Sequence, residues 1–234
     1  KLADPRVRQA ISMAIDRDFL AKEIWRGGMI PGYSIVPPGI GNYPDPVFLE
    51  YKDMDILDRE DAAKKLLEEA GVAPGSLAVE LRYNTSENHK NTMTAVADML
   101  KNIGITATLF EMEGTGYFDY MKQDGDFDIT RAGWIGDYSD PQNFLFLFES
   151  QNLGFNYPRW ANADYDALMK KAETTVDLKE RAGVLRQAEE IFLKEGPAIP
   201  VLLHGSGSLV SSKLKGWEDN VMNVHGSRWL TLEQ

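Results

Sequence analysis

The most regular alternation of hydrophobic and polar positions lies between residues 78 and 134. Residues 78–84 and 105–111 alternate apolar and polar side chains, a period of two that predicts half-buried β-strands. The segment between them predicts an amphipathic helix whose inner face is formed by Met93, Val96, Met99, Leu100 and Ile103. A short helix over GTGYFDYMKQ and a third strand at 127–134 follow. Strands that alternate with helices in this way predict an α/β fold with a mixed or parallel sheet covered by helices.

Helix signals precede this region. Asp4 followed by Pro5 is typical of a helix start, and Asp16 is suited to cap a second helix. Asp58 is suited to cap a third helix, which is expected to end at Gly71. Between the second and third helices, the segment GGMIPGYSIVPPGIGNYPDP is too rich in glycine and proline for a helix or a central strand. Because it also contains aromatic and aliphatic residues, we expect an ordered surface loop.

The last third of the chain is predicted to be mainly helical. Helices are expected from Asp140, from Asn162 and across residues 178–196, followed by a strand at 198–204 and an irregular tail. The first residues run almost at once into a helical pattern and lack the layout of a signal peptide. We therefore expect the chain to be part of a longer one.

Composition narrows the class of protein. Of 234 residues, 43% are hydrophobic and 26% charged, and no apolar run approaches the roughly 20 residues of a membrane-spanning helix. The 25 basic and 36 acidic residues give a formal net charge of −11 without basic clusters, which opposes binding to nucleic acids or anionic lipids. The absence of cysteine excludes disulfides, thiolate metal sites and cysteine nucleophiles, and leaves the compartment open.

Signals of catalysis or metal binding are weak. His204 begins the run HGSGS, which lacks the surroundings of a serine nucleophile and predicts a flexible turn. His89, His204 and His225 are far apart and show no metal-ligand spacing. The acidic stretch DGDFD lacks the pattern of a calcium loop, and no glycine-rich phosphate motif occurs. We therefore expect neither a metal nor a cofactor.

Two polar residues, Asn84 and Asp137, follow predicted strands, which is where ligands bind in sheets of this kind. Asp137 and Asp140 could form the acid/base pair of an Asp-dependent hydrolase. However, Asp140 precedes Pro141 and is better explained as a helix cap. This leaves one free carboxylate, which is rarely enough for a hydrolase.

Asp137 has two interpretations. With Trp134 and Tyr138 it could belong to an ordinary loop, the aspartate in a turn and the aromatic rings in the core. Alternatively, a carboxylate between aromatic rings at the end of a strand binds a primary ammonium group through charge-assisted hydrogen bonds. If residues 131–135 lie at an exposed sheet edge, their backbone can pair with an extended peptide whose amino terminus reaches Asp137. Backbone pairing and one ammonium site together select peptides as a class.

Several motifs, in one order, resemble a known family: ADPRVRQAISMAIDRDFL, VPPGIGNY, RYNTSENHK, AGWIGDYSDPQNFL and NADYDALMKKA. They are similar to the extracytoplasmic substrate-binding proteins of oligopeptide and dipeptide ABC transporters. The similarity covers essentially the whole chain, but only the carboxyl-terminal half of such receptors. It implies an α/β, periplasmic-binding-protein-like lobe at residues 1–203 and a tail at 204–234 that returns to a first lobe.

With the residues discussed above, the resemblance implies a ligand site formed by Asn84, His89, Lys122, Gln123, Arg131, Gly133, Trp134, Ile135 and Asp137. In the family, the aspartate matching Asp137 pairs with the peptide's amino terminus, and the stretch matching 131–135 contributes backbone hydrogen bonds. Lys122 and Gln123 fall where some members carry arginine and histidine near the far end of the peptide. This departure leaves the preferred peptide length open.

The implied function is the substrate-binding component of an ABC transporter. Such a protein is a periplasmic, monomeric, non-enzymatic receptor that closes over an oligopeptide and delivers it to a membrane permease. Three alternatives stay open: a receptor of the same fold for a nickel chelate, haem or oligosaccharide, an Asp-dependent hydrolase, and an interaction domain built on the acidic helices at 58–71 and 178–195.

Overall fold

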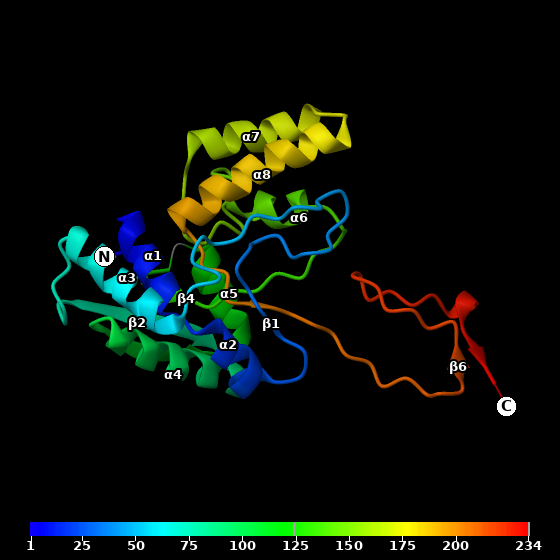
Figure 1. The fold of residues 1–234 in the computed structure, drawn as a ribbon, viewed down its shortest axis with the longest axis horizontal. Helices are drawn as coiled ribbons and strands as arrows, with labels where there is room; N and C mark the ends of the chain where they lie inside the picture. The colour runs from blue at the N-terminus through cyan, green and yellow to red at the C-terminus, as the bar shows by residue number, and fades with distance from the viewer. Residues whose placement is uncertain (124, 234) are drawn as a thin grey trace.

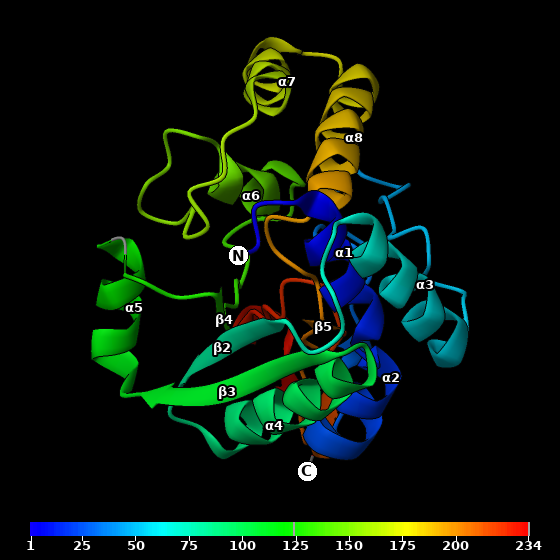
Figure 2. The same cartoon turned by 90° about the vertical axis from the view of Figure 1, so that its left-hand side faces the viewer.

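A parallel β-sheet lies at the centre of the molecule, whose computed structural model describes residues 1–123 and 125–233. β2 (Leu77–Asn84) is the middle strand, β3 (Ile105–Met112) lies on one side of it and β4 (Ile129–Thr130) on the other, and both pair with it in parallel. α4 (Glu87–Asn102) connects β2 to β3 and packs against both strands (Figure 2). The predicted β–α–β unit and the α/β fold are therefore confirmed.

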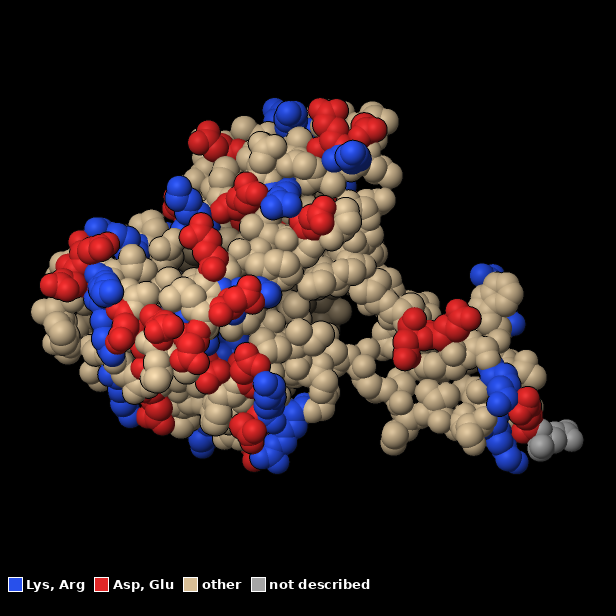
Figure 3. All heavy atoms as spheres, in the orientation of Figure 1, with Lys and Arg blue, Asp and Glu red and all other residues tan. Residues whose placement is uncertain are grey.

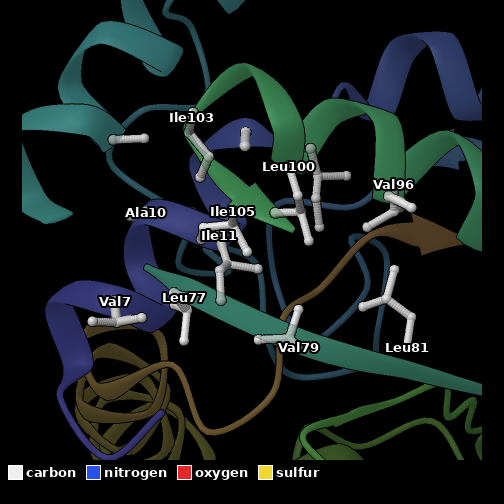
Figure 4. Close-up of a cluster of buried hydrophobic side chains, with 14 of the residues drawn as sticks. Val7, Ala10, Ile11, Leu77, Val79, Leu81, Val96, Leu100, Ile103 and Ile105 are labelled. Atoms are coloured by element: carbon white, nitrogen blue, oxygen red, sulfur yellow. The ribbon is translucent and has the colours of Figure 1, made fainter. Parts of the chain in front are cut away.

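The first hydrophobic core lies between this sheet, α4 and α1 (Pro5–Ala14) (Figure 4). Leu77, Val79 and Leu81 occupy alternate positions of β2, and Val96 and Leu100 come from the facing side of α4. Leu81 and Leu100 are fully buried. The strand period of two and the helical spacing bring the apolar faces together as the sequence predicts.

The first helices begin where the capping residues predict. Asp4 caps α1 by accepting a hydrogen bond from the backbone N–H of Arg6 at 2.9 Å. Asp16 caps α2 (Arg17–Phe19) by accepting one from Phe19 N–H at 3.0 Å, and the helix continues as a π-helix over Leu20–Trp25.

The third helix, α3 (Ile56–Glu69), packs on α1 and ends before Gly71, as predicted. Gly71 has a φ of +75°, a conformation that glycine adopts without strain. The prediction of Asp58 as the cap is wrong, because Asp55 accepts the hydrogen bond from Leu57 N–H at 2.9 Å. Asp58 lies in the first turn instead, where its charge still favours the helix dipole.

A second layer consists of the helical hairpin α7 (Ala163–Thr174) and α8 (Leu178–Glu195), which lies at the top of Figure 1. Asn162 caps α7 as predicted. The helix expected from Asp140 is short, because α6 (Gln142–Leu145) passes at once into a 3-10 turn at Phe146–Phe148. These elements and the loop at 33–51 enclose a second hydrophobic cluster.

The glycine- and proline-rich loop is ordered, as predicted, and a buried carboxylate of α8 holds it. Glu189 is fully buried and accepts hydrogen bonds from the backbone N–H groups of Ile35, Val36 and Val47 and from the hydroxyl of Tyr43. Burial raises the pKa of Glu189, and the four donors oppose that effect. The loop therefore has a fixed position relative to α8.

Two predicted strands are shorter than expected. The strand predicted at 127–134 is limited to β4, and the one predicted at 198–204 is limited to β5 (Leu202–Leu203), which pairs antiparallel with β1 (Ile30–Pro31). Prolines within or next to β1 and β5 remove N–H donors from this ladder. The alternation at 127–134 marks apolar positions, but a strand also needs a neighbouring strand to pair with. Only Ile129 and Thr130 pair with β2.

Beyond β5, residues 204–233 extend away from both layers as an arm (Figure 1). Its tip is a small hairpin of β6 (Leu214–Lys215) and β7 (Thr231–Leu232), with a 3-10 turn at Ser227–Trp229. Large apolar side chains are exposed on the arm, among them Leu209 and Trp229. Figure 3 shows that the segment joining the arm to the body carries almost no charge. None of the helices in the described residues has the length and apolar character needed to cross a bilayer.

Candidate functional site

Most of the predicted site residues lie around the carboxyl-terminal edge of the sheet. β2 ends at Asn84, and Arg131 directly follows β4. α5 (Gly114–Lys122) holds the chain beyond β4, because the hydroxyl of its fully buried Tyr117 donates to the backbone oxygen of Arg131. This edge is where ligands bind in sheets with parallel strands.

Residues 132–137 present an unpaired backbone. The N–H of Arg131 donates to the backbone oxygen of Arg82 at 2.9 Å and ties the start of this stretch to the central strand. Within residues 1–123 and 125–233, the N–H and C=O groups of residues 132–137 take part in no hydrogen bond. Ile135 is 87% exposed. A ligand backbone can therefore reach this stretch from solvent.

Asp137 is exposed, and in the described part of the chain its carboxylate has neither a hydrogen bond nor an ion pair. Tyr138 is 49% exposed and is therefore not a core residue. Trp134 packs against the second hydrophobic cluster, with its ring edge-on to Phe155 at 5.2 Å and its Nε1 donating to Asn143 Oδ1 at 2.8 Å. The aspartate thus lies between one anchored ring and one exposed ring.

The residues after Asp137 are fixed from two sides. Ser139 Oγ accepts a hydrogen bond from the backbone N–H of Gly41 at 2.8 Å. Asp140 accepts the N–H of Gln142, the first residue of α6, at 2.9 Å and so ties down the helix start as predicted, although the N-cap position itself is Pro141. Asp140 also binds Arg181 of α8 through both carboxylate oxygens, at 2.7 and 2.9 Å, a contact that the sequence did not predict.

A second set of side chains, which we call the cationic group, consists of Arg131, His89 and His204 around Trp25. The ring of Trp25 lies 5.9 Å from the ring of His89 and 5.4 Å from that of His204. Burial lowers the pKa of both histidines, and the positive charge of Arg131 lowers them further. The guanidinium of Arg131 is thus close enough to oppose protonation of both rings.

The polar atoms of this group are incompletely paired. His89 Nδ1 donates to the backbone oxygen of Asn84 at 3.1 Å, but the buried Asn84 Oδ1 has no partner. Burial lowers the pKa of Arg131, whose guanidinium makes no hydrogen bond or ion pair within the described residues. Because a largely buried guanidinium is costly without an anion, this arrangement favours binding of a carboxylate or another anionic group.

Trp25 and His204 were not predicted as site residues. Trp25 ends the π-helix and His204 follows β5, so only the fold brings their rings together. The sequence contains no direct indication of a site role for His204. The run HGSGS, which begins at His204, resembles only the setting of a serine nucleophile, an interpretation that its surroundings do not support. Because Trp25 and His204 are far apart in the sequence, a ligand role for either residue could not be inferred from local patterns.

Lys122 and Gln123 are exposed at the end of α5. In the described residues, no hydrogen bond or ion pair joins their side chains to Asp137 or to the cationic group. The backbone oxygen of Lys122 accepts a hydrogen bond from Arg159 at 2.7 Å. Residues 1–123 and 125–233 contain no cluster of three or more histidine, cysteine or acidic side chains suited to hold a metal ion.

Comparison with known proteins identifies the family. Residues 1–156 match the family described as bacterial extracellular solute-binding proteins, family 5 Middle. The chain belongs to this family. The chain is similar to the periplasmic murein peptide-binding protein MppA of Escherichia coli, 36% identical over 93% of this chain and 40% of the relative. The oligopeptide-binding protein OppA of Bacillus subtilis is 32% identical over 92% of this chain and 40% of its own length.

Solved structures of similar proteins agree with the fold. The unliganded open form of the murein tripeptide-binding protein MppA superposes with a TM-score of 0.90 at 35% identity, covering 99% of this chain and 45% of that one. The expected periplasmic-binding-protein-like lobe is therefore confirmed. The chain spans about two-fifths of the length of these curated relatives.

Proposed function

We propose that this chain is the ligand-binding lobe of an extracytoplasmic oligopeptide receptor of an ABC transporter. The observation that carries the proposal is the carboxylate of Asp137 at the end of the backbone stretch 132–137, both without a partner among residues 1–123 and 125–233. Residues 1–203 form the lobe, and the arm from residue 204 returns toward the first lobe of the receptor. The receptor is a monomer without enzymatic activity, works in the periplasm and passes its ligand to a membrane permease.

The unpaired stretch and the carboxylate suit two parts of one ligand. The predicted pairing stretch 131–135 loses Arg131, because its backbone N–H and oxygen are already bonded to Arg82 and Tyr117. We therefore assign to the peptide groups of residues 132–136 the pairing with an extended peptide, which gives affinity that does not depend on side chains. Asp137 then accepts charge-assisted hydrogen bonds from the ligand's ammonium group, each worth about 1.5–3 kcal/mol. A free amino terminus is the ammonium group that every unmodified peptide carries.

The cationic group supplies the opposite charge. Arg131 has no anionic partner in the described residues, and His89 and His204 lie within its electrostatic range. We assign this group to a carboxylate of the ligand, either the carboxyl terminus of a short peptide or an acidic side chain of a longer one. Lys122 and Gln123 have no part in this assignment.

The test is Asp137→Asn in the receptor that carries both lobes, titrated calorimetrically with trialanine and with N-acetyl-trialanine. We expect the substitution to weaken trialanine binding about 10- to 100-fold, because the charge-assisted bonds to the ammonium group are lost. Acetylation should weaken binding to the unmodified receptor to a similar extent and to the variant hardly further. Asp61→Asn, which changes an exposed carboxylate on α3, is the matched control.

Equal affinity of the unmodified receptor and Asp137→Asn for trialanine would contradict the ammonium site. A solute that binds tightly to both forms would favour the alternative of a non-peptide ligand such as an oligosaccharide, which has no ammonium group to offer.

A further inference from the structure

Two carboxylates of the same loop have different surroundings. Asp140 binds Arg181 through two hydrogen bonds of 2.7 and 2.9 Å, and both side chains are about four-fifths buried. Asp137, three positions earlier, has no partner in the described residues. Arg181 therefore neutralises Asp140, which has no part in the proposed function. In the described residues it leaves Asp137, the proposed ammonium site, unpaired.

Arg181 is held near this loop by α8 itself. The helix begins at Leu178, and its inner residues Leu185 and Ala188 are fully buried in the second hydrophobic cluster. The base of the Arg181 side chain therefore stays in place whether or not Asp140 is charged. Burial raises the pKa of the Tyr138 hydroxyl, Asp140 and Asp137 raise it further, and Arg181 opposes them, so all three charges act on the same part of the loop.

Building on the proposed function, we propose that Asp140 is a positioning residue that keeps Asp137 available for the ligand by engaging Arg181. Without the charge of Asp140, the guanidinium of Arg181 is left largely buried and unpaired, which is unfavourable. Asp137 is then an accessible carboxylate in the same loop. Arg181 competes with the ligand's ammonium group for it, and affinity for peptides falls.

The alternative role for this ion pair is mechanical, as a clamp that holds the loop. Other contacts already fix the loop: Gly41 N–H donates to Ser139 Oγ, Trp134 donates to Asn143, and the hydroxyl of Tyr138 donates to Gln142. These contacts do not involve Arg181. Removal of the ion pair therefore changes the charge near Asp137 more than it changes the path of the chain.

The two roles make different predictions for a double variant. In the two-lobed receptor, Asp140→Asn should weaken trialanine binding by about tenfold or more, measured by titration calorimetry. Adding Arg181→Gln should restore affinity to within about threefold of the unmodified receptor, because the competing cation is gone. If the ion pair is a clamp, the double variant, which lacks the clamp as well, should bind trialanine as weakly as Asp140→Asn.

Wild-type affinity in Asp140→Asn, or a double variant as weak as Asp140→Asn, would overturn the inference. If Asp140→Asn does not fold, Arg181→Gln decides: the added negative charge of a free Asp140 should tighten trialanine binding by about twofold, and weaker binding would overturn the inference. Loss of binding in Asp137→Asn with unchanged binding in Asp140→Asn would remove only this inference. Unchanged binding in Asp137→Asn would remove the proposed ammonium site itself.

Discussion

Arg131 combines two roles in one residue. Its backbone N–H continues the pairing with the central strand, while its guanidinium lies near His89 and His204 with no hydrogen bond or ion pair in the described residues. Backbone and side chain therefore act on different parts of the site. A substitution at Arg131 that keeps the backbone in place should affect recognition of the ligand's anionic group alone.

The two histidines give this group a measurable pH dependence. Burial and the charge of Arg131 lower the pKa of His89 and of His204 below the ordinary value of about 6.5, so both rings are mainly neutral at neutral pH. A carboxylate bound beside them favours the protonated rings and raises both pKa values. We therefore expect net proton uptake when a peptide with a free carboxyl terminus binds near pH 6, and none near pH 8.

Calorimetry of trialanine binding in two buffers with different ionisation enthalpies measures this proton uptake. The matched controls are C-terminally amidated trialanine and the variant His89→Gln/His204→Gln, in which the buffer dependence should disappear. A binding enthalpy that is independent of buffer in the unmodified receptor near pH 6 would contradict the assignment of a carboxylate to this group.

The same shifts set the sign of the effect of pH on stability. Because the folded-state pKa of each histidine is lowered, the unfolded chain binds more protons below about pH 6.5. The histidine contribution to the free energy of unfolding is therefore fully present above that pH and is lost as the pH falls toward the folded-state values. A bound carboxylate should offset this loss.

At the scale of elements, the contact of β2 with α4 supports the site. The strand that ends at Asn84 and the helix that carries His89 share the first hydrophobic core, and His89 Nδ1 donates to the backbone oxygen of Asn84 at 3.1 Å. Glu189 has the corresponding role in the second layer, where it fixes the loop that contacts Ser139.

Leu100→Ala tests the importance of this core for stability. Leu100 is fully buried, so the substitution should lower the free energy of unfolding by about 2–5 kcal/mol through lost burial and a cavity. Leu57→Ala on α3, at a side chain that is 68% exposed, is the control and should change it by about 0.5 kcal/mol or less. Chemical denaturation of both variants measures the difference, and equal effects would contradict the position of α4 in the core.

At the scale of the whole molecule, the arm and the open site suggest how the lobe works. Ligand affinity in a two-lobed receptor depends on contacts with both lobes, and the ligand favours the closed state only by its differential affinity for that state. On the proposed function, this chain supplies the contacts of one lobe only. The exposed apolar side chains of the arm have the character of a surface that packs against another part of a protein.

We therefore expect the isolated chain to bind trialanine weakly or undetectably, and at least about 100-fold more weakly than the receptor with both lobes. Titration calorimetry with both proteins under the same conditions measures the ratio. Micromolar affinity of the isolated chain would show that one lobe is sufficient and would contradict the requirement for closure.

The sequence by itself determined the features that depend on local chemistry. Residues 78–84, 105–111 and the apolar face of α4 follow from periodicity, and Gly71 and Asn162 mark helix ends, because each depends on neighbours within one or two turns. Five motifs in one order along the chain indicated the family, which the comparisons confirm.

Only the tertiary structure decided what depends on long-range contacts. It limited the third strand to β4, placed His204 against Trp25, and paired Asp140 with Arg181 rather than leaving it as a helix cap alone. The partners in the last two pairs are separated by 179 and 41 residues, so no local pattern records them. Asp140 is neutralised by Arg181, whereas Asp137 has no partner in the described part of the chain, and this difference follows from the position of α8 beside the loop rather than from the residue types.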